Sequence, residues 1–264
     1  MISKLAPMAA LYHENSSICR DTLSQDLESI QAFLGDDELI RQAMTGHKTY
    51  PIEHRVPLGS SGRLREPKTS LFDALRSRRT IRRFSEASLS LDELKMLLTA
   101  SFGQTGTLQH PSDPDLTQPL RAYPSGGALY PVEIYLANHR VDGLRAGIHH
   151  LNVVDNCLEL VTEDAGRVEA AGQAILAGES DSKPALTFIF TILWKHVLTK
   201  YGERGYRIAL LETGHVVQNL LLVAASMKLA ALPIAGFDDR RIGTALDLKF
   251  GVEDVVYVAA VGKG

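Results

Sequence analysis

The sequence predicts an α+β fold in which helices flank a mixed central sheet. Residues 185–194 (ALTFIFTILW) are almost wholly apolar and rich in β-branched and aromatic residues, as in a central strand buried on both faces. Further strand-like runs are interleaved with segments of helical periodicity. Residues 205–229 form one long predicted helix that is apolar nearly all round between residues 216 and 225, which indicates a buried spine or an oligomer core.

The composition is that of one large domain, with or without an extra lobe. The 264 residues are 45% hydrophobic and 22% charged, and a chain of this size buries enough apolar surface to need no disulfide or metal. A net charge of -3 gives no electrostatic basis for binding nucleic acid or a membrane surface. Cys19 and Cys157 lack the spacing of a disulfide framework or a zinc site, so we expect a cytoplasmic protein. We find no signal-peptide pattern, and no apolar run approaches the roughly 18 residues of a membrane span.

The N-terminal part is weakly patterned. Residues 23–44 are compatible with a helix, and residues 57–70 (PLGSSGRLREPKTS) have the Ser, Gly and Pro content of a linker. We therefore expect an N-terminal extension and linker over residues 1–69 and the main domain over residues 70–264.

Two helices at the start of the main domain have clear start signals. Ser70 can cap a short helix, and Ser90 with Glu93 forms a capping-box pattern before apolar residues at helical spacing. Gly103 ends that second helix. Residues 104–124, rich in Pro and Asp, predict a loop.

Several strands are expected after this loop. Residues 132–137 alternate between the two faces and predict a strand. Residues 148–153 and 157–161 flank an Asp-Asn turn and predict a hairpin. Residues 254–262 predict a last apolar strand.

Residues 77–84 (SRRTIRRF) are the first candidate site. Arginine guanidinium groups bind phosphate bidentately, and Ser or Thr hydroxyls can add hydrogen bonds. In an extended segment the alternate residues Arg78, Thr80 and Arg82 share one side. The pattern predicts an anion site; the alternative is a solvated basic turn, because charge runs are usually exposed.

Residues 121–131 (RAYPSGGALYP) are the second candidate site and lead directly into the strand at residues 132–137. Gly126 and Gly127 allow a backbone to approach a planar ring or a phosphate with no Cβ between them, and Ser125 supplies a hydroxyl. An ordinary Gly-Pro turn is the alternative. Neither a G-x-G-x-x-G fingerprint nor a P-loop is present.

The third candidate site is residues 200–207 (KYGERGYR), between the central strand and the long helix. The Lys200 ammonium would lower the pKa of the neighbouring Tyr201 phenol, or a desolvated Lys200 would itself become a usable base. A solvated loop is the alternative.

We expect no metal site. His149 and His150 lie on a predicted strand and point to opposite faces, so they would not chelate one metal ion. His215, in the long helix beside Glu212, is expected to make a polar contact in a helix core. No H-E-x-x-H or G-x-S-x-G motif supports a hydrolase.

Taken together, RRTIRRF, PSGGALYP and KYGERGYR leading into LLETGHVVQNLLLVAA resemble the motifs of the nitroreductase superfamily. Within it, the chain is similar to the azoline-oxidase branch, the SagB-type dehydrogenases, which act with a cyclodehydratase on thiazole- and oxazole-modified peptides of the microcin and streptolysin types. The resemblance covers residues 71–264, and residues 11–16 (LYHENS) also resemble that branch. RRTIRRF marks only the superfamily, whereas PSGGALYP with KYGERGYR is more specific to the branch.

The resemblance implies a nitroreductase-like domain at residues 70–264 that binds FMN, without covalent attachment, at a homodimer interface formed around the long helix. The RRTIRRF motif would contact phosphate and ribityl groups, the PSGG loop would contact the ring, often from the second subunit, and residues 233–236 would bring backbone amides toward the ring. Lys200 and Tyr201 fall on the catalytic pair. The implied cofactor-binding residues are Arg78, Arg79, Thr80, Arg82, Pro124, Ser125, Gly126, Gly127, Ile234, Ala235, Gly236 and Lys263.

The implied function is oxidation of peptide thiazolines or oxazolines to thiazoles or oxazoles, with cyclodehydratase subunits and a precursor peptide as partners. The flavin would carry the redox chemistry, and the protein would supply position and a base. Tyr201 is assigned as the base and Lys200 as the group that tunes it, with the reverse assignment left open. Two alternatives stay open: a nicotinamide-dependent nitro- or quinone-reductase, and a flavin-bound scaffold of a cyclodehydratase complex.

Overall fold

The computed structural model describes residues 6–17, 23–59, 67–110, 112–175, 180 and 182–264. The strands are β1 (Val56–Pro57), β2 (Leu89–Ser90), β3 (Gln104–His110), β4 (Asp113–Arg121), β5 (Val132–Asn138), β6 (Val141–Asp142), β7 (Gly147–Asn152), β8 (Cys157–Thr162), β9 (Leu186–Leu193), β10 (Ala230–Ile234) and β11 (Glu253–Gly262). The helices are α2 (Pro7–Asn15), α3 (Leu23–Gly35), α4 (Asp37–Thr45), α5 (Leu71–Ser77), α6 (Leu91–Phe102), α7 (Ala165–Gln173), α8 (Trp194–Tyr201), α9 (Arg204–Ser226) and α10 (Asp239–Ala245), with short 3-10 turns η1 (Ile52–His54) and η3 (Gly126–Ala128).

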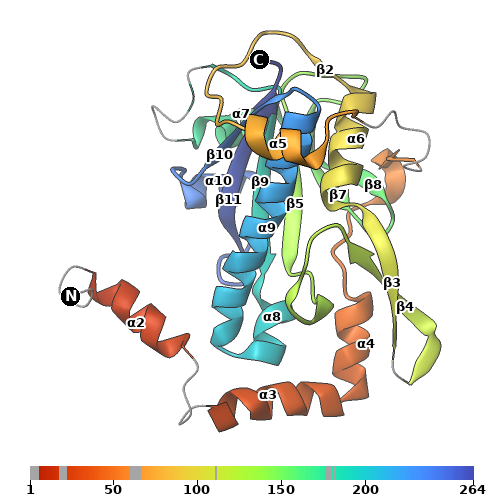
Figure 1. The fold of residues 1–264 in the computed structure, drawn as a ribbon, viewed down its shortest axis with the longest axis vertical. Coiled ribbons are helices and arrows are strands. Elements are labelled where there is room, and N and C mark those ends of the chain that lie inside the picture. Colours follow the sequence, from red (N-terminus) through yellow and green to blue (C-terminus); the bar gives the residue numbers. More distant parts are fainter. Residues whose placement is uncertain (1–5, 18–22, 60–66, 111, 176–179, 181) are drawn as a thin grey trace.

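A seven-stranded sheet with the order β1-β8-β7-β5-β9-β11-β10 forms the centre of the molecule (Figure 1). The α+β class is confirmed, but the sheet is not mixed: each neighbouring pair in it is antiparallel. A short connection, such as the β7–β8 hairpin, can join only antiparallel neighbours, because parallel strands need a long crossover. Parallel pairing is found in the small β2–β6 sheet.

Helices cover both faces of the central sheet (Figure 1). On β9, Phe188 and Phe190 belong to the core that includes residues of α6 and α9, whereas Ile189 belongs to the core with residues of α7 and α10. Every residue of β9 except the last is buried. The prediction of a central strand at residues 185–194 is therefore confirmed. The run is apolar because both faces of the strand are buried.

The predicted helix starts are confirmed. Ser70 accepts a hydrogen bond from the backbone of Asp73, and Ser90 with Glu93 forms the complete capping box of α6. The hairpin of β7 and β8 turns at Asn156, which has a φ of +51°. Asn tolerates this left-handed conformation better than most residues.

Two expectations about local structure were wrong. Residues 104–124 contain the β3–β4 ribbon instead of a loop; Pro119 pairs with Thr107 in it, and a two-stranded ribbon leaves outer edges where proline breaks no ladder. Residues 23–44 form two helices instead of one. They separate at Asp36, whose side chain caps α4 by accepting from the backbone of Glu38 and Leu39.

The long helix is confirmed as α9, with 23 residues. By length and composition alone α9 could cross a membrane, although we found no apolar run of that length in the sequence. In this chain 44% of its most apolar window is buried. Core helices of soluble proteins pass the same test, and α9 packs against β5, β10 and β11.

The segment before β1 is tied to the sheet by buried polar contacts. Lys48 Nζ lies 2.5 Å from Glu253 Oε2, and Arg55 lies 2.7 Å from Glu159 Oε1. The backbone N–H of Tyr50 donates to Glu159 at 3.1 Å. Residues 48–57 thus pack as part of the sheet layer, and β1 adds its edge strand.

His150 sits between two buried glutamates. Its ring nitrogens lie 2.7 Å from Glu133 Oε2 and 3.0 Å from Glu159 Oε2, whereas His149 contacts the carbonyl of Arg145. Burial is the largest single effect on the His150 pKa and lowers it, but the bonds to Glu133 and Glu159 together raise the pKa above its usual value. The described part of the chain holds no cluster of three or more His, Cys, Asp or Glu suited to a metal ion.

Two features of the sequence fall outside the described residues. They are Cys19 and the middle of the expected linker, residues 60–66. Cys157 is described and is a buried free thiol.

Candidate active site

The PSGG loop, residues 124–127, lies directly over Lys200 and Tyr201 at the end of α8. A Cβ placed on Gly127 would lie 2.6 Å from Lys200 Nζ and 2.8 Å from the Tyr201 hydroxyl oxygen. Gly127 also has a φ of +64°, a conformation that favours glycine. The second and third sequence motifs therefore meet in the same chain.

The loop is held by contacts on both sides. Ala128 and Tyr130 have φ values of +55° and +46°, and such strained residues persist only where their surroundings fix them. Gln118 of β4 donates to the carbonyl of Ala128 at 2.7 Å, and the Tyr130 hydroxyl accepts from the backbone of Arg121 at 3.0 Å. The β3–β4 ribbon, which we had expected to be a loop, is thus a support of the site.

Glu212 of α9 is a site residue that sequence reasoning missed. Its Oε2 accepts the Ser125 hydroxyl at 2.6 Å, and Ser125 Oγ in turn accepts the N–H of Tyr130 at 2.8 Å. The Glu212 side chain is buried, and burial raises its pKa to about 7 against the opposing effect of the Ser125 bond. Its Oε1 has no partner among the described residues.

One signal could have found Glu212. It lies in the helical register of the buried apolar residues of α9, such as Ala209 and Val216. A glutamate at a buried position is rare unless it has a polar partner. We had treated Glu212 only as a neighbour of His215. His215 is exposed in this chain, so the expected contact in a helix core was wrong.

The Lys200 and Tyr201 side chains are both partly buried, and burial shifts the pKa of each. It lowers the pKa of Lys200 and raises the pKa of Tyr201. The first direction agrees with a desolvated lysine, but the second is opposite to the lowering that we expected. The Lys200 ammonium lies 5.4 Å from the centre of the Tyr201 ring, over its face. Burial thus shifts both groups in the direction of their neutral forms.

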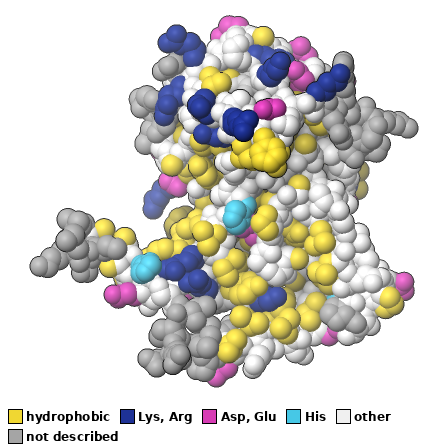
Figure 2. All heavy atoms as spheres, viewed as in Figure 1, with side chains coloured by type: hydrophobic (Ala, Val, Ile, Leu, Met, Phe, Trp, Pro, Cys, Tyr) yellow, Lys and Arg dark blue, Asp and Glu magenta, His cyan; other side chains and the backbone are white. Residues whose placement is uncertain are grey.

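The RRTIRRF motif runs extended from the end of α5 alongside β10, where Ile81 donates to the carbonyl of Ala231 at 3.0 Å. Thr80 and Arg82 are exposed and Arg78 is half-buried. Arg79 turns back to the carbonyls of Arg76 and Arg78. Most residues of the motif are thus exposed in this chain. Lys and Arg side chains gather on the upper part of the view in Figure 2.

The remaining predicted cofactor residues lie at the end of β10 and the end of β11. Ile234 is buried, Ala235 is exposed and Gly236 is half-buried. Lys263 is paired with Glu93, the capping residue of α6, and its carbonyl accepts from the backbone of Ser85 at 2.9 Å. Lys263 therefore lies beside the chain that follows RRTIRRF.

The arginine motif and the Lys200-Tyr201 pair lie near opposite ends of α9. Thr69, just before α5, donates to the carbonyl of Ser226 at the last residue of α9, whereas α8 ends just before the first residue of α9. A helix of 23 residues is about 34 Å long. Within one chain, the start of the arginine motif is thus remote from Lys200 and Tyr201.

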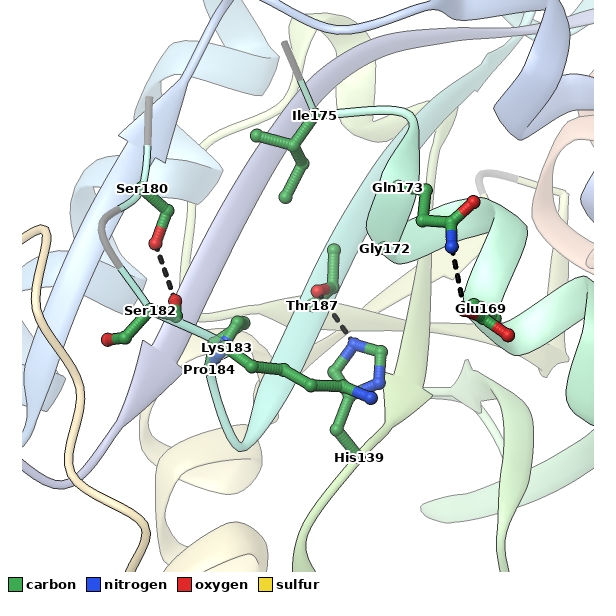
Figure 3. A pocket seen from close by; sticks show the side chains of 10 residues that line it. All are labelled: His139, Glu169, Gly172, Gln173, Ile175, Ser180, Ser182, Lys183, Pro184 and Thr187. Carbon is green, nitrogen blue, oxygen red and sulfur yellow. Dashed lines mark hydrogen bonds between the residues drawn. The ribbon is translucent and has the colours of Figure 1, made fainter. Parts of the chain in front are cut away.

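A separate cavity lies beside α7 and the start of β9 (Figure 3), and Ser180 in its lining donates to the carbonyl of Arg82 at 3.2 Å. His139 projects into it, with Nε2 3.0 Å from the Thr187 hydroxyl. Burial lowers the pKa of His139 to about 4, so this ring is neutral. None of the predicted site residues lines this cavity.

A sequence model described as the Nitroreductase family matches residues 75–263. The chain belongs to the nitroreductase family. Among curated proteins, the Microcin B17-processing protein McbC of Escherichia coli is 32% identical over 166 residues, which cover 61% of this chain and 57% of McbC. The Trifolitoxin-processing protein TfxB of Rhizobium leguminosarum bv. trifolii is 26% identical over 216 residues, 78% of this chain and 54% of TfxB. The chain thus spans little more than half the length of these two relatives.

Solved structures support the nitroreductase fold. A protein described as a nitroreductase from Anabaena variabilis aligns with a TM-score of 0.72 and 22% identity, over 96% of this chain and 45% of that chain. The E. coli Microcin synthetase McbBCD complex, with truncated pro-MccB17 bound, contains a chain that aligns with a TM-score of 0.58 and 24% identity, over 94% of this chain and 98% of that chain. The similarity to McbC and TfxB supports the SagB-type branch of the family that the motifs indicated.

Proposed function

We propose that this nitroreductase-family protein is an FMN-dependent dehydrogenase that oxidises peptide thiazolines or oxazolines. The observation that carries the proposal is the Lys200-Tyr201 pair packed beneath the glycine loop, in a chain similar to two peptide-processing proteins. A precursor peptide and cyclodehydratase subunits are the proposed partners, and the cytoplasm is the proposed location.

The residues present fit FMN. Arg82 and Thr80 are exposed, and Arg78 is half-buried, which suits a terminal phosphate that guanidinium groups can bind bidentately. Gly126 and Gly127 present a surface with no Cβ, as a planar ring requires. When bound, FMN would accept the two electrons and the second hydrogen that oxidation of the ring releases.

We further propose that two copies of the chain complete each site. The arginine motif begins at one end of α9 and the Lys-Tyr pair lies at the other, so a partner copy would bring the two groups together. Hydrophobic side chains gather on the face that Figure 2 shows. Among the exposed hydrophobic residues are Phe72 of α5, at 71%, and Leu211 of α9, at 58%. Such a surface is typical of a protein interface.

In the proposed reaction Lys200 is the base. Its burial favours the neutral amine, which can take a proton from the ring carbon of the azoline. Tyr201, whose burial favours the protonated phenol, can orient the peptide by donating a hydrogen bond. This is the reverse of the assignment we first favoured. The glycine loop over the pair would exclude water from the reacting atoms.

The test compares Lys200→Ala, Tyr201→Phe and the double variant with the parent protein. A precursor peptide treated by its cyclodehydratase is assayed by mass spectrometry, where each oxidised ring has lost two hydrogens. We expect each single variant to lose about 10²–10⁴-fold in rate and the double variant to lose little more, because the two residues act as a unit.

Flavin content and light scattering check that each variant keeps FMN and its assembly state. Full oxidation by the double variant would refute the mechanism and favour a scaffold role. Rapid flavin reduction by NADH or NADPH, with nitro- or quinone-reduction unaffected by the double substitution, would identify a nicotinamide-dependent reductase instead.

A further inference from the structure

Helix α3 lies outside residues 75–263, which match the family, yet it contacts the Lys200-Tyr201 turn. Helix α3 packs against α8. The Lys200 ammonium lies 5.1 Å from the centre of the Phe33 ring, and Phe33 is 5% exposed. Ser29, one turn before Phe33 on α3, donates to the backbone carbonyl of Lys200 at 3.1 Å. The Lys200 ammonium thus lies close to both Phe33 and Gly127.

A second contact joins the N-terminal segment to the same motif. Arg207 donates to the carbonyl of His13 at 2.9 Å and to the Ser16 hydroxyl at 2.5 Å. The Tyr206 ring stacks on Trp194 with centroids 4.6 Å apart and meets the edge of Tyr12 at 5.4 Å. Residues 200–207 and 11–16, the two stretches that resemble the azoline-oxidase branch, therefore contact each other.

We infer that helix α3 forms one wall of the active site, with residues 7–17 held nearby on residues 204–207, and that Phe33 and Ser29 are positioning residues for Lys200. Ser29 fixes the backbone of Lys200 at the end of α8. Phe33 fixes the direction of its side chain, so that the nitrogen lies against Gly127. This inference rests on the proposed function for the catalytic role of Lys200, but the contacts themselves do not depend on it.

The Phe33 ring also has an electrostatic consequence. The face of an aromatic ring attracts an ammonium group, so Phe33 stabilises the charged form of Lys200 while burial acts in the opposite direction. The titratable neighbour that faces Lys200 in the described structure is Tyr201, on the same helix. Replacing the ring by an aliphatic side chain of similar size keeps the burial and removes the attraction, so the pKa of Lys200 should fall.

The experiment measures the rate of acetylation of Lys200 by acetic anhydride as a function of pH, with site-by-site mass spectrometry of the full-length protein. Lys195, exposed on the same helix, is the internal reference. We expect Phe33→Leu to lower the apparent pKa of Lys200 by roughly 0.5–1 unit and to leave Lys195 unchanged. The matched control is the same change at an exposed phenylalanine elsewhere in the chain, Phe250→Leu, which should leave both lysines unchanged.

The pH profile of azoline oxidation should move in the same direction in Phe33→Leu, whereas a merely structural role would lower stability without this shift. An unchanged Lys200 titration in a folded Phe33→Leu variant would overturn the inference. If that variant does not fold, Phe33→Met is measured in the same way and decides the question. A parent protein that oxidises no azoline would refute the proposed function, while the acetylation data would still decide the role of Phe33.

Discussion

Gly127→Ala tests whether the glycine loop must lie in contact with the Lys-Tyr pair. The new residue would be held at a φ of +64°, which costs a residue with a Cβ roughly 1–2 kcal/mol. Its Cβ would also fall 2.6 Å from Lys200 Nζ. It would also fall 2.8 Å from the Tyr201 hydroxyl, so the ends of both side chains would have to leave their present positions, that of Lys200 against the Phe33 ring. The contact should therefore reduce activity more than stability.

The assay is azoline oxidation by mass spectrometry, together with thermal unfolding and flavin content. A displacement of about 1 Å at a reacting group can cost about 10²-fold in rate, and we expect a loss of this size. Gly251→Ala is the matched control, because Gly251 has a φ of +77° and open space where its Cβ would lie. Both variants should be destabilised to a similar extent, and only Gly127→Ala should lose activity. Wild-type oxidation by a flavin-loaded Gly127→Ala protein would refute the reasoning.

Three further outcomes are expected. Arg82→Ala should weaken FMN binding about 10- to 100-fold in a fluorescence titration, since a charge-assisted bond to phosphate is lost; unchanged affinity would exclude Arg82 from the phosphate site. His150 has a raised pKa, so its stabilising effect is complete below the ordinary pKa of 6.5 and is lost as pH rises through the raised value. In His150→Gln, the free energy of unfolding measured in urea should no longer fall as pH rises through that range. For Glu212, whose pKa is raised from 4.5 to about 7, stability should likewise fall as pH rises through that range, and Glu212→Gln should abolish that fall.

The elements that local patterns specify were predictable from the sequence. The capping box at Ser90 and the apolar run of β9 depend on neighbours in the chain or on simple burial, and both were confirmed. The β3–β4 ribbon was missed because its prolines indicate a loop. Only the pairing of the two strands shows that Pro119, opposite Thr107, is accommodated in a ribbon. The antiparallel order of the sheet likewise depends on which strands meet.

The site was predictable in part. The motifs predicted Ser125, Gly127, Lys200 and Tyr201 as site residues, and the structure brings the loop and the Lys-Tyr pair together in one chain. Their electrostatics were not predictable, because the shift of Tyr201 follows from burial by elements distant in sequence. Phe33 was missed for the same reason: a phenylalanine in a weakly patterned helix carries no sign of contact with a lysine 167 positions later.

The positions of the motifs on α9 separate two tasks. RRTIRRF, which is general to the superfamily, starts near the C-terminal end of α9 and lies beside Lys263. The motifs specific to the branch lie toward the N-terminal end of α9, where the glycine loop, the Lys-Tyr pair and the N-terminal segment contact one another. In the proposed dimer the first group would bind the cofactor and the second would select the chemistry. One fold could then serve different substrates by changing only the second group, because activity depends on the site and not on the fold that carries it.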